Sequence, residues 1–233
     1  MTQPTPEVST EAVVEVALES FATKGFEDTR LDTIAAESGM SKRMIHYHFG
    51  DKKGLYIKAL QLAITQLRPE QQDMEMDSTV PAEGILRIVD AIYRRMILYP
   101  NATRMIALES LFGAGGMKER AALADQSVIL LQMDKILMMG QDSGAFRPGI
   151  SAIDVYTIIS SLCMFRIANR STFVNLYDTD FLAEDNVDGM GELIGDVVLS
   201  FLTSTLPSRE HMSYLTQHPH VSQSSDANSI YND

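Results

Sequence analysis

The segment 38–53, SGMSKRMIHYHFGDKK, concentrates side chains that could bind a ligand or take part in chemistry. It places His46 and His48 on either side of Tyr47, and it holds no acidic residue before Asp51. Such a segment is compatible with a metal site, a catalytic dyad or a nucleic-acid surface. Because positions two apart on a helix do not share a face, the two histidines cannot hold one metal ion together. The spacing therefore disfavours the metal site.

The sequence lacks the residue sets that most catalytic and metal sites need. It has no Ser-His-Asp or Cys-His set in a suitable context, no phosphate-binding loop and no Glu-x-x-His pair. His211, His218 and His220 lie in a polar tail, where HPH is a weak metal motif. We therefore predict no catalytic residue, no metal ligand, no cofactor and no enzymatic activity. An enzyme built on a helical bundle is the disfavoured alternative.

Composition and length describe an ordinary globular chain. Its 233 residues can bury a substantial core, and its formal net charge is −12. A single cysteine, Cys163, excludes an intramolecular disulfide and fits a reducing compartment. The sequence has no run of 18 apolar residues, and its N-terminus has neither the basic region nor the apolar core of a secretory signal. These features predict a cytoplasmic protein that does not enter a membrane.

Positive charge is concentrated in one short part of this acidic chain. Residues 1–40 hold eight acidic residues and two basic ones, whereas residues 41–58 hold five basic residues against Asp51 alone. Phosphate is attracted only where cations outnumber acids. The charge pattern therefore predicts one local face for a nucleic acid on a protein that otherwise repels it.

Capping residues and apolar spacing predict four helices in the N-terminal region. Ser9 or Thr10 can cap the first helix, and Gly25 is placed to close it. The second helix ends at Gly39, the third begins at Ser41, and the fourth spans about 52–67. A short helix, a turn with a glycine and a second short helix form a helix-turn-helix, which we place at about residues 31–50.

The two faces of this helix-turn-helix differ in character. Its inward residues are apolar: Leu31, Ile34, Met40, Ile45 and Phe49. Its outward residues on the third helix are hydrogen-bond donors, rings and one apolar side chain: Lys42, Arg43, Met44, His46 and Tyr47. Such groups suit the base edges and phosphate rims of the DNA major groove. The backbone N–H groups after Ser41 point toward a phosphate as well.

The segment 17–60 resembles the N-terminal domain of TetR-type (TetR/AcrR) transcriptional repressors. The matching features keep the family's order and spacing: Gly25-Phe26 followed by Thr29, Ile34-Ala35 before Gly39, Ser41-Lys42, His48-Phe49, and Lys52 with Leu55. The chain departs from the family where Arg43-Met44 replaces a frequent Gly-Thr, and where His46 replaces a frequent phosphate-contacting tyrosine. The operator sequence of a relative therefore cannot be transferred to this chain.

The resemblance and the chemistry together predict the DNA contacts. By resemblance, Thr29, Ser41, Tyr47 and Lys52 position phosphates, and His46 contacts either a phosphate or a base. The guanidinium fork of Arg43 fits the O6/N7 edge of guanine, so we expect it to read a base. The full predicted DNA-binding set is Thr29, Arg30, Ser41, Lys42, Arg43, Met44, His46, Tyr47 and Lys52.

The rest of the chain reads as helical. Residues 68–84 are polar and contain two prolines, which predicts a linker, and no later run alternates with the period of a strand. Helices are predicted at about 83–98, 102–112, 118–142, 151–169 and 187–205. We expect an all-α protein with three parts: a DNA-binding domain at 9–68, a larger helical effector-binding and dimerisation domain at 69–206, and a disordered tail at 207–233.

The second domain is expected to bind a small organic effector, as the family resemblance implies. Segments 93–113 and 165–181 loosely resemble regulators of the pyrimidine-utilisation subgroup, from which no pyrimidine ligand is inferred. Candidate pocket residues are polar or adaptable side chains on apolar helices: Tyr93, Arg104, Glu109, Gln132, Met138, Arg166 and Asn169. The last two long helices are the predicted dimer interface, where Gly191 and Gly195 permit close approach of another helix.

These features predict a ligand-responsive repressor that binds a palindromic operator on double-stranded DNA as a homodimer. A small-molecule effector would release it from that operator. The alternative within the same fold is a redox-responsive regulator that acts through Cys163, although a cysteine in an apolar helix is inert by default.

Overall fold

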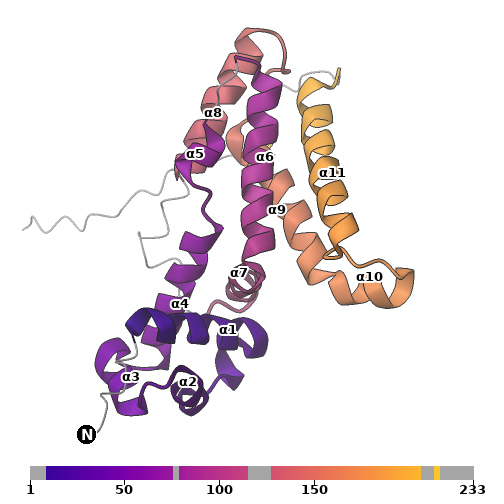
Figure 1. Cartoon of the computed structure of the whole chain (residues 1–233). Helices are drawn as coiled ribbons and strands as arrows, with labels where there is room; N and C mark the ends of the chain where they lie inside the picture. The colour runs from indigo at the N-terminus through magenta and orange to yellow at the C-terminus, as the bar shows by residue number, and fades with distance from the viewer. Residues whose placement is uncertain (1–8, 76–78, 115–126, 206–212, 216–233) are drawn as a thin grey trace, which may run out of the picture.

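The computed structural model describes residues 9–75, 79–114, 127–205 and 213–215, and within them it contains helices and no strand (Figure 1). The helices are α1 (Thr10–Asp28), α2 (Leu31–Ser38), α3 (Lys42–Phe49), α4 (Lys52–Leu67), α5 (Gln71–Met74), α6 (Pro81–Leu98), α7 (Pro100–Phe112), α8 (Ser127–Asp142), α9 (Ala152–Ala168), α10 (Arg170–Tyr177) and α11 (Glu184–Thr203). The prediction of an all-α fold is confirmed.

The head of the molecule, which we define as α1 to α4, lies at one end of the structure and has its own apolar core (Figure 1). The hydroxyl of Ser9 caps α1 by accepting a hydrogen bond from the N–H of Ala12. Gly25, with φ of 78°, breaks the helical path before Asp28, in the left-handed conformation that glycine adopts at low cost. The stripe of α1 then packs on Ile34, Ile45 and the apolar face of α4.

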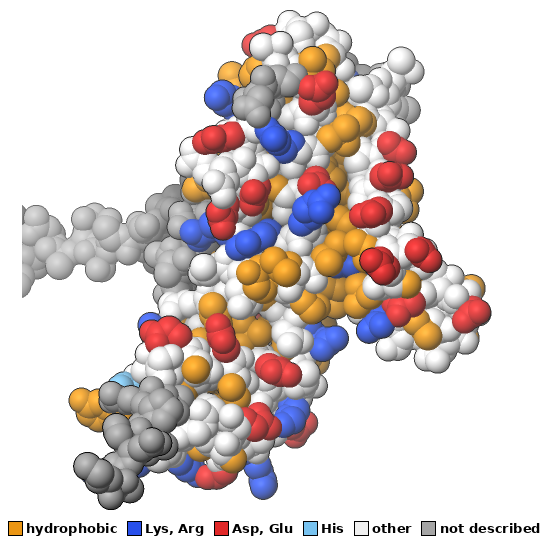
Figure 2. Space-filling model, viewed as in Figure 1, with side chains coloured by type: hydrophobic (Ala, Val, Ile, Leu, Met, Phe, Trp, Pro, Cys, Tyr) orange, Lys and Arg blue, Asp and Glu red, His pale blue; other side chains and the backbone are white. Residues whose placement is uncertain are grey.

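The effector region, which we define as residues 81–205 and name after the role expected of it, is built around α6. A second apolar core joins α6 to α8, α9 and α11, and residues such as Ile88, Met133, Ile159 and Val198 are fully enclosed there. In Figure 2 apolar side chains follow the seam between α6 and α11, while acidic side chains cover the outer side of α11. Glu184 and Asp185 in the first turn of α11 complement the positive end of its dipole.

Helix α7 belongs to both parts of the molecule. It follows α6 in the predicted second domain, yet Ala102 and Met105 are buried in the core of the head. The hydroxyl of Tyr56 on α4 donates a 2.9 Å hydrogen bond to the carboxylate of Glu109 on α7, and both side chains are buried. Burial and this carboxylate raise the pKa of Tyr56 above its usual value. The head therefore has a polar link as well as apolar contacts with the effector region.

Loss of this link should lower stability measurably. We expect Tyr56→Phe to reduce the free energy of unfolding by about 1.5–3 kcal/mol, because it removes a buried hydrogen bond to a carboxylate. Urea denaturation followed by circular dichroism measures the change. The matched control is Tyr47→Phe, which alters a hydroxyl on a side chain that is 79% exposed and should change stability by less than about 0.5 kcal/mol. Equal effects of the two changes would contradict the account.

Two of the three glycines of α11, Gly191 and Gly195, serve packing within the chain. A Cβ on Gly191 would lie 3.0 Å from the ring of Tyr93, and one on Gly195 would lie 2.8 Å from the side chain of Leu86. Both contacts are with α6, so these glycines let α6 and α11 of one chain approach closely. From the sequence we expected these glycines to allow close approach of another helix at the dimer interface. In the structure, the helix that approaches them is α6 of the same chain.

One segment differs from the sequence-based expectations, and one predicted helix is described only in part. Residues 170–177 form α10, which we did not predict; Arg170 and Asp180 pair across its end at 2.7 Å, and Phe173 packs on Phe165 and Phe181. The predicted helix 118–142 is seen from Ser127 onward, and its first part lies outside the described residues.

The tail predicted to be disordered at 207–233 is described only at residues 213–215. The hydroxyl of Ser213 and the backbone N–H groups of Tyr214 and Leu215 donate hydrogen bonds to the carboxylate of Asp154 at the start of α9. Asp154 supplies acceptors to these three residues that the sequence of the tail does not reveal, and the disorder expected of the tail stays a prediction. The rest of the tail lies outside the described residues.

No single described helix is long and apolar enough to cross a membrane. The consecutive helices α9 and α10, with a 60° bend between them, pass the test of length and composition only when they are taken together.

Candidate nucleic-acid interface and effector region

The turn between α2 and α3 fixes the orientation of α3. Gly39 adopts the left-handed conformation, with φ of 77°, and its N–H donates to the carbonyl of Ala35. The hydroxyl of Ser41 then caps α3 by accepting a hydrogen bond from the N–H of Met44 at 3.3 Å. Ile45 is 1% exposed and anchors the inner face of α3 in the core of the head. These contacts leave the rest of α3 directed outward.

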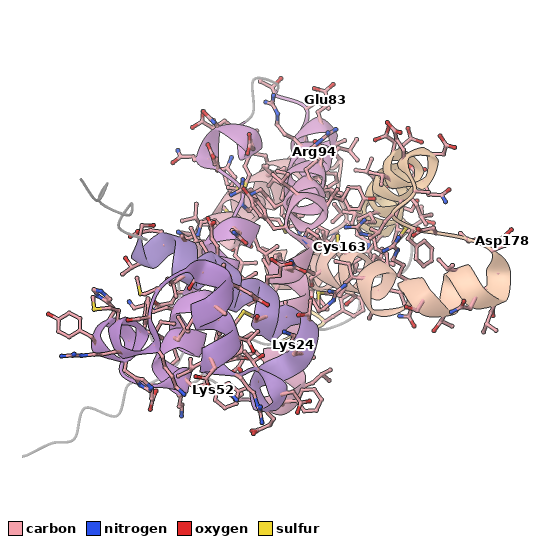
Figure 3. The ribbon with its side chains drawn as sticks, turned by 60° about the horizontal axis from the view of Figure 1, so that its bottom comes forward. Lys24, Lys52, Glu83, Arg94, Cys163 and Asp178 are labelled. Atoms are coloured by element: carbon pink, nitrogen blue, oxygen red, sulfur yellow. The ribbon has the colours of Figure 1, made fainter. Side chains whose placement is uncertain are left out.

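The outward face of α3, which we call the recognition face, carries the groups that the sequence predicted. Lys42, Arg43 and His46 are exposed, Met44 is 40% exposed and Tyr47 is 79% exposed. His48, two positions from His46, is exposed as well, and its ring meets Tyr47 edge-on at 5.1 Å. Figure 3 views the molecule with this end turned forward, with Lys52 labelled near it.

Several contacts hold the polar groups of the recognition face in place. Lys42 pairs with Asp32 of α2 at 2.8 Å, and its hydrogen bond lowers the pKa of that carboxyl. Nδ1 of His46 donates to the carbonyl of Gly50 at 2.8 Å, so a neutral ring presents Nε2 outward as an acceptor. Lys52 donates to the carbonyl of Glu27 at 2.9 Å. Arg30 is exposed beside α2.

Thr29 has a structural contact in place of an outward one. Its side chain is 1% exposed, and its hydroxyl lies 2.7 Å from the carbonyl of Gly25 and 3.2 Å from that of Ser20. The hydroxyl therefore closes the end of α1 onto the start of α2. The phosphate contact that the family resemblance implied for Thr29 stays a prediction, and the buried position of its side chain does not favour it. The other eight predicted DNA-binding residues are not buried in the structure, and their contacts with DNA stay a prediction.

The predicted effector residues do not form one pocket. Arg104 lines a cavity of about 660 Å³ between the end of α1 and α7, and Glu109 is bonded to Tyr56. Gln132 lines a separate hollow between α5 and α8, and Met138 is 64% exposed. Asn169 donates to the carbonyl of Phe165 at the end of its own helix.

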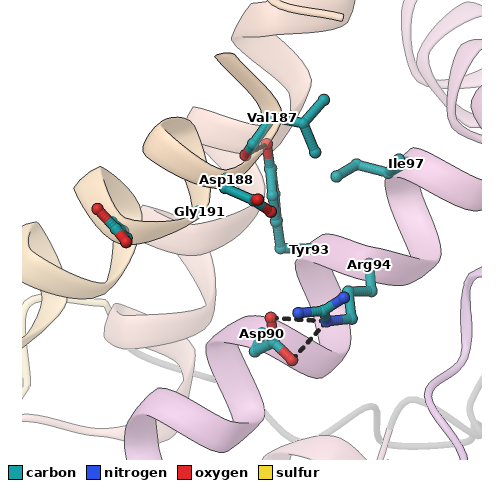
Figure 4. Close-up of a pocket in the computed structure, with 8 residues that line it drawn as sticks. Asp90, Tyr93, Arg94, Ile97, Val187, Asp188 and Gly191 are labelled. Carbon is teal, nitrogen blue, oxygen red and sulfur yellow. Dashed lines mark hydrogen bonds and ion pairs between the residues drawn. The ribbon is translucent and has the colours of Figure 1, made fainter. Parts of the chain in front are cut away.

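Only Tyr93 and Arg166 come together. Tyr93 is 3% exposed on α6 and Arg166 is 0% exposed on α9, and the guanidinium carbon lies 5.0 Å from the centre of the ring. Tyr93 also lines an open pocket of about 370 Å³ between α6 and α11, where Asp90 pairs with Arg94 (Figure 4). No group of three potential metal-ligating side chains occurs in the described parts of the chain.

Tyr56 is a functional candidate that sequence reasoning missed. It lies in the apolar face of α4, where nothing local distinguishes it from a core residue. Its partner Glu109 is 53 positions away, so only the folded structure reveals the pair.

The position of Cys163 makes its thiol unreactive. It is 0% exposed within the core of the effector region, and burial raises the pKa of its thiol to about 12, against an opposing effect of Arg166.

Because the thiolate is the reactive form, we expect Ellman's reagent to label Cys163 in native protein at least about 100-fold more slowly than in denatured protein. Rapid labelling of the native protein would restore the redox alternative. Cys163→Ser should leave DNA binding unchanged under oxidant.

The fold and the recognition face define a helix-turn-helix protein of the DNA-binding regulator class. Models of known families then identify both parts of the chain. The model of bacterial regulatory proteins of the tetR family matches residues 13–59, and the tetracycline repressor-like C-terminal domain model matches residues 81–198. The chain therefore belongs to the TetR family. Members of this family are transcriptional regulators, so the prediction of a protein that is not an enzyme is confirmed.

Individual relatives agree with this assignment. The HTH-type transcriptional repressor NicS of Pseudomonas putida is 28% identical over 179 residues, which cover 76% of this chain and 81% of NicS. The HTH-type transcriptional regulator RutR of Escherichia coli is 34% identical over 105 residues, which cover 44% of this chain and 48% of RutR. The structure of FadR from Bacillus subtilis in complex with stearoyl-CoA superposes with a TM-score of 0.57 at 14% identity, covering 83% of this chain and all of that one.

Proposed function

We propose that this protein is a dimeric repressor that binds a palindromic operator with α3 of each chain and leaves it when a small organic effector binds. The observation that carries the proposal is the recognition face. On a chain of net charge −12, it presents Arg43, His46 and Tyr47 on a helix that Ile45 fixes in the core. Cations and planar donors on a short, anchored helix fit the major groove.

A dimer follows from the small reach of one recognition helix. A two-fold pair places two copies of α3 about 34–36 Å apart, or a multiple of that distance, and so matches an inverted repeat. Large apolar side chains remain exposed on α9, α10 and α11: Phe165, Leu176, Tyr177, Leu193 and Val197. A second copy that covered them would remove this apolar area from water. Their location supports the interface predicted from the sequence.

Helix α7 connects the effector region with the head, so a change caused by effector binding would reach the DNA-binding face through it. It contacts α9 of the effector region, and it packs on α1 and α4 of the head. An effector that favoured a different position of α7 would change the spacing of the two heads, with a coupling free energy of about 1–3 kcal/mol. FadR, a structural neighbour that binds stearoyl-CoA, is consistent with ligand binding in this fold.

Binding to DNA upstream of the protein's own gene tests the proposal. In an electrophoretic mobility shift assay we expect one discrete complex that contains two chains per site, and light scattering of the free protein should give the mass of a dimer. A monomer in solution, or binding that shows no preference over unrelated DNA of equal length, would contradict the proposal.

A further inference from the structure

Arg166 is a charged side chain for which the described residues supply no counter-charge. It is 0% exposed on α9, its Nε, Nη1 and Nη2 atoms have no hydrogen-bond partner of good geometry among those residues, and the hydroxyl of Tyr93 acts on it only as a polar neighbour. A guanidinium carries five donors and stays protonated in proteins. A buried ion is tolerated when it is paired, and it is strongly destabilising when it is alone. The described residues therefore leave the charge of Arg166 uncompensated.

The neighbours of Arg166 do not neutralise it. The ring of Tyr93 faces the guanidinium carbon at 5.0 Å, which gives a cation–π contact but no formal charge. The hydroxyl of Tyr93 donates at 2.6 Å to the carbonyl of Val187 on α11. Cys163, one turn earlier on α9, is a buried thiol whose raised pKa keeps it neutral. These contacts hold the guanidinium in place and leave its charge for another group.

The outer pocket beside Tyr93 does not supply a site for an anion. Asp90, Asp188 and Glu192 line it against Arg94, which already pairs with Asp90 (Figure 4). An excess of carboxylates there repels a negative ligand. Arg166 is not among the residues that line this pocket, so an anion bound to its guanidinium would lie outside it.

We propose that Arg166 anchors a closed anion site and that the effector is a small organic molecule with one carboxylate. The planar fork of arginine binds the two oxygens of a carboxylate through parallel hydrogen bonds, and Tyr93 covers the guanidinium on one side. A single negative charge matches the single cation, whereas a phosphate dianion would leave excess charge in an enclosed site. This inference rests on the proposed function, because it names the chemical class of the effector.

The test compares matched ligands and two variants by thermal unfolding. The probes are butyrate, hexanoate and benzoate, with butyramide, hexanamide and benzamide as neutral counterparts, and inorganic phosphate as the other oxyanion. We expect at least one of the carboxylates to raise the Tm of the wild-type protein by about 5 °C or more at about 100 times its Kd, and its amide to have no effect. A rise with phosphate and none with carboxylates would overturn the assigned class.

The variants separate a binding role from a structural one. Arg166→Met removes the unpaired charge and keeps an apolar stem, so the Tm of the unliganded variant should equal or exceed that of wild type, and the response to the carboxylate should vanish. Arg166→Lys keeps the charge without the fork and should weaken the carboxylate at least about 10-fold. A marked fall in the Tm of Arg166→Met, or its failure to fold, would show that Arg166 pairs with a group of the chain itself and would overturn the proposal.

Operator binding, measured by fluorescence anisotropy on the same samples, distinguishes the two proposals. If wild-type protein binds its operator and none of the carboxylates raises its Tm, only the inference about Arg166 fails. If a carboxylate acts through Arg166 and no operator is bound, the proposed function fails and the anion site stands.

Discussion

Replacing Arg43 with alanine is expected to weaken binding to the cognate operator by about 5- to 150-fold, equivalent to about 1–3 kcal/mol, because the variant loses a bidentate contact with one base. Arg43 is exposed on the recognition face, so the fold does not depend on its side chain and the Tm should stay within about 2 °C of wild type. Fluorescence anisotropy with labelled operator measures the affinity.

Arg43→Lys is the matched control for charge. It keeps the attraction to phosphates but cannot form two parallel hydrogen bonds with guanine, so specific affinity should fall nearly as far as in the alanine variant. Affinity for unrelated DNA should stay near that of wild type, because that binding depends on charge. If Arg43→Ala binds the operator as tightly as wild type, the assignment of the recognition face is wrong.

Replacing Gly54 with alanine is expected to lower the free energy of unfolding by about 1–3 kcal/mol and to weaken operator binding with it. A Cβ on Gly54, in the first turn of α4, would overlap with the backbone carbonyl of Phe49 at the end of α3. Backbone atoms cannot turn aside as a flexible side chain can, so α3 must shift relative to α4. That shift moves the recognition face away from the position that the core of the head defines.

Gly189→Ala is the control for the introduction of a methyl group into a helix. A Cβ on Gly189, within α11, meets no atom within 4 Å. Alanine favours a helix over glycine by about 0.5–1 kcal/mol, so this variant should be as stable as wild type or more stable. Thermal unfolding and operator anisotropy of both variants check the prediction. A Gly54→Ala protein with wild-type Tm and affinity would contradict the described contact between α3 and α4.

The helix-turn-helix could be predicted because its signals are local. A glycine at the left-handed turn, a serine cap and apolar residues at helical spacing all lie within about 20 residues, and each acts on its neighbours in the chain. The recognition face follows from the same spacing, since an anchor such as Ile45 determines which residues of α3 point outward. Thr29 is the predicted DNA-binding residue whose side chain does not point outward. Its hydroxyl is within hydrogen-bond distance of two backbone carbonyls of α1.

The effector region could be predicted only in outline, because its important contacts are distant in sequence. Tyr93 and Arg166 meet although 73 positions separate them, and Tyr56 bonds to Glu109 across 53 positions. A spacing of four between Gly191 and Gly195 indicates close helix approach but not which helix approaches. Of the pocket residues expected from the sequence, Tyr93 and Arg166 lie together, whereas Met138 is exposed and Gln132 lies elsewhere; a role for any of them in effector binding stays a prediction.

The central claim is that two copies of α3 read an inverted repeat. Selection of bound sequences from a pool of random double-stranded DNA tests it most directly, because it assumes no promoter. The account predicts enrichment of two inverted half-sites whose centres lie about one helical turn apart, or a whole number of turns, with a guanine in each that is no longer selected by Arg43→Ala. Enrichment of a single unrepeated site, or of no sequence at all, would contradict it.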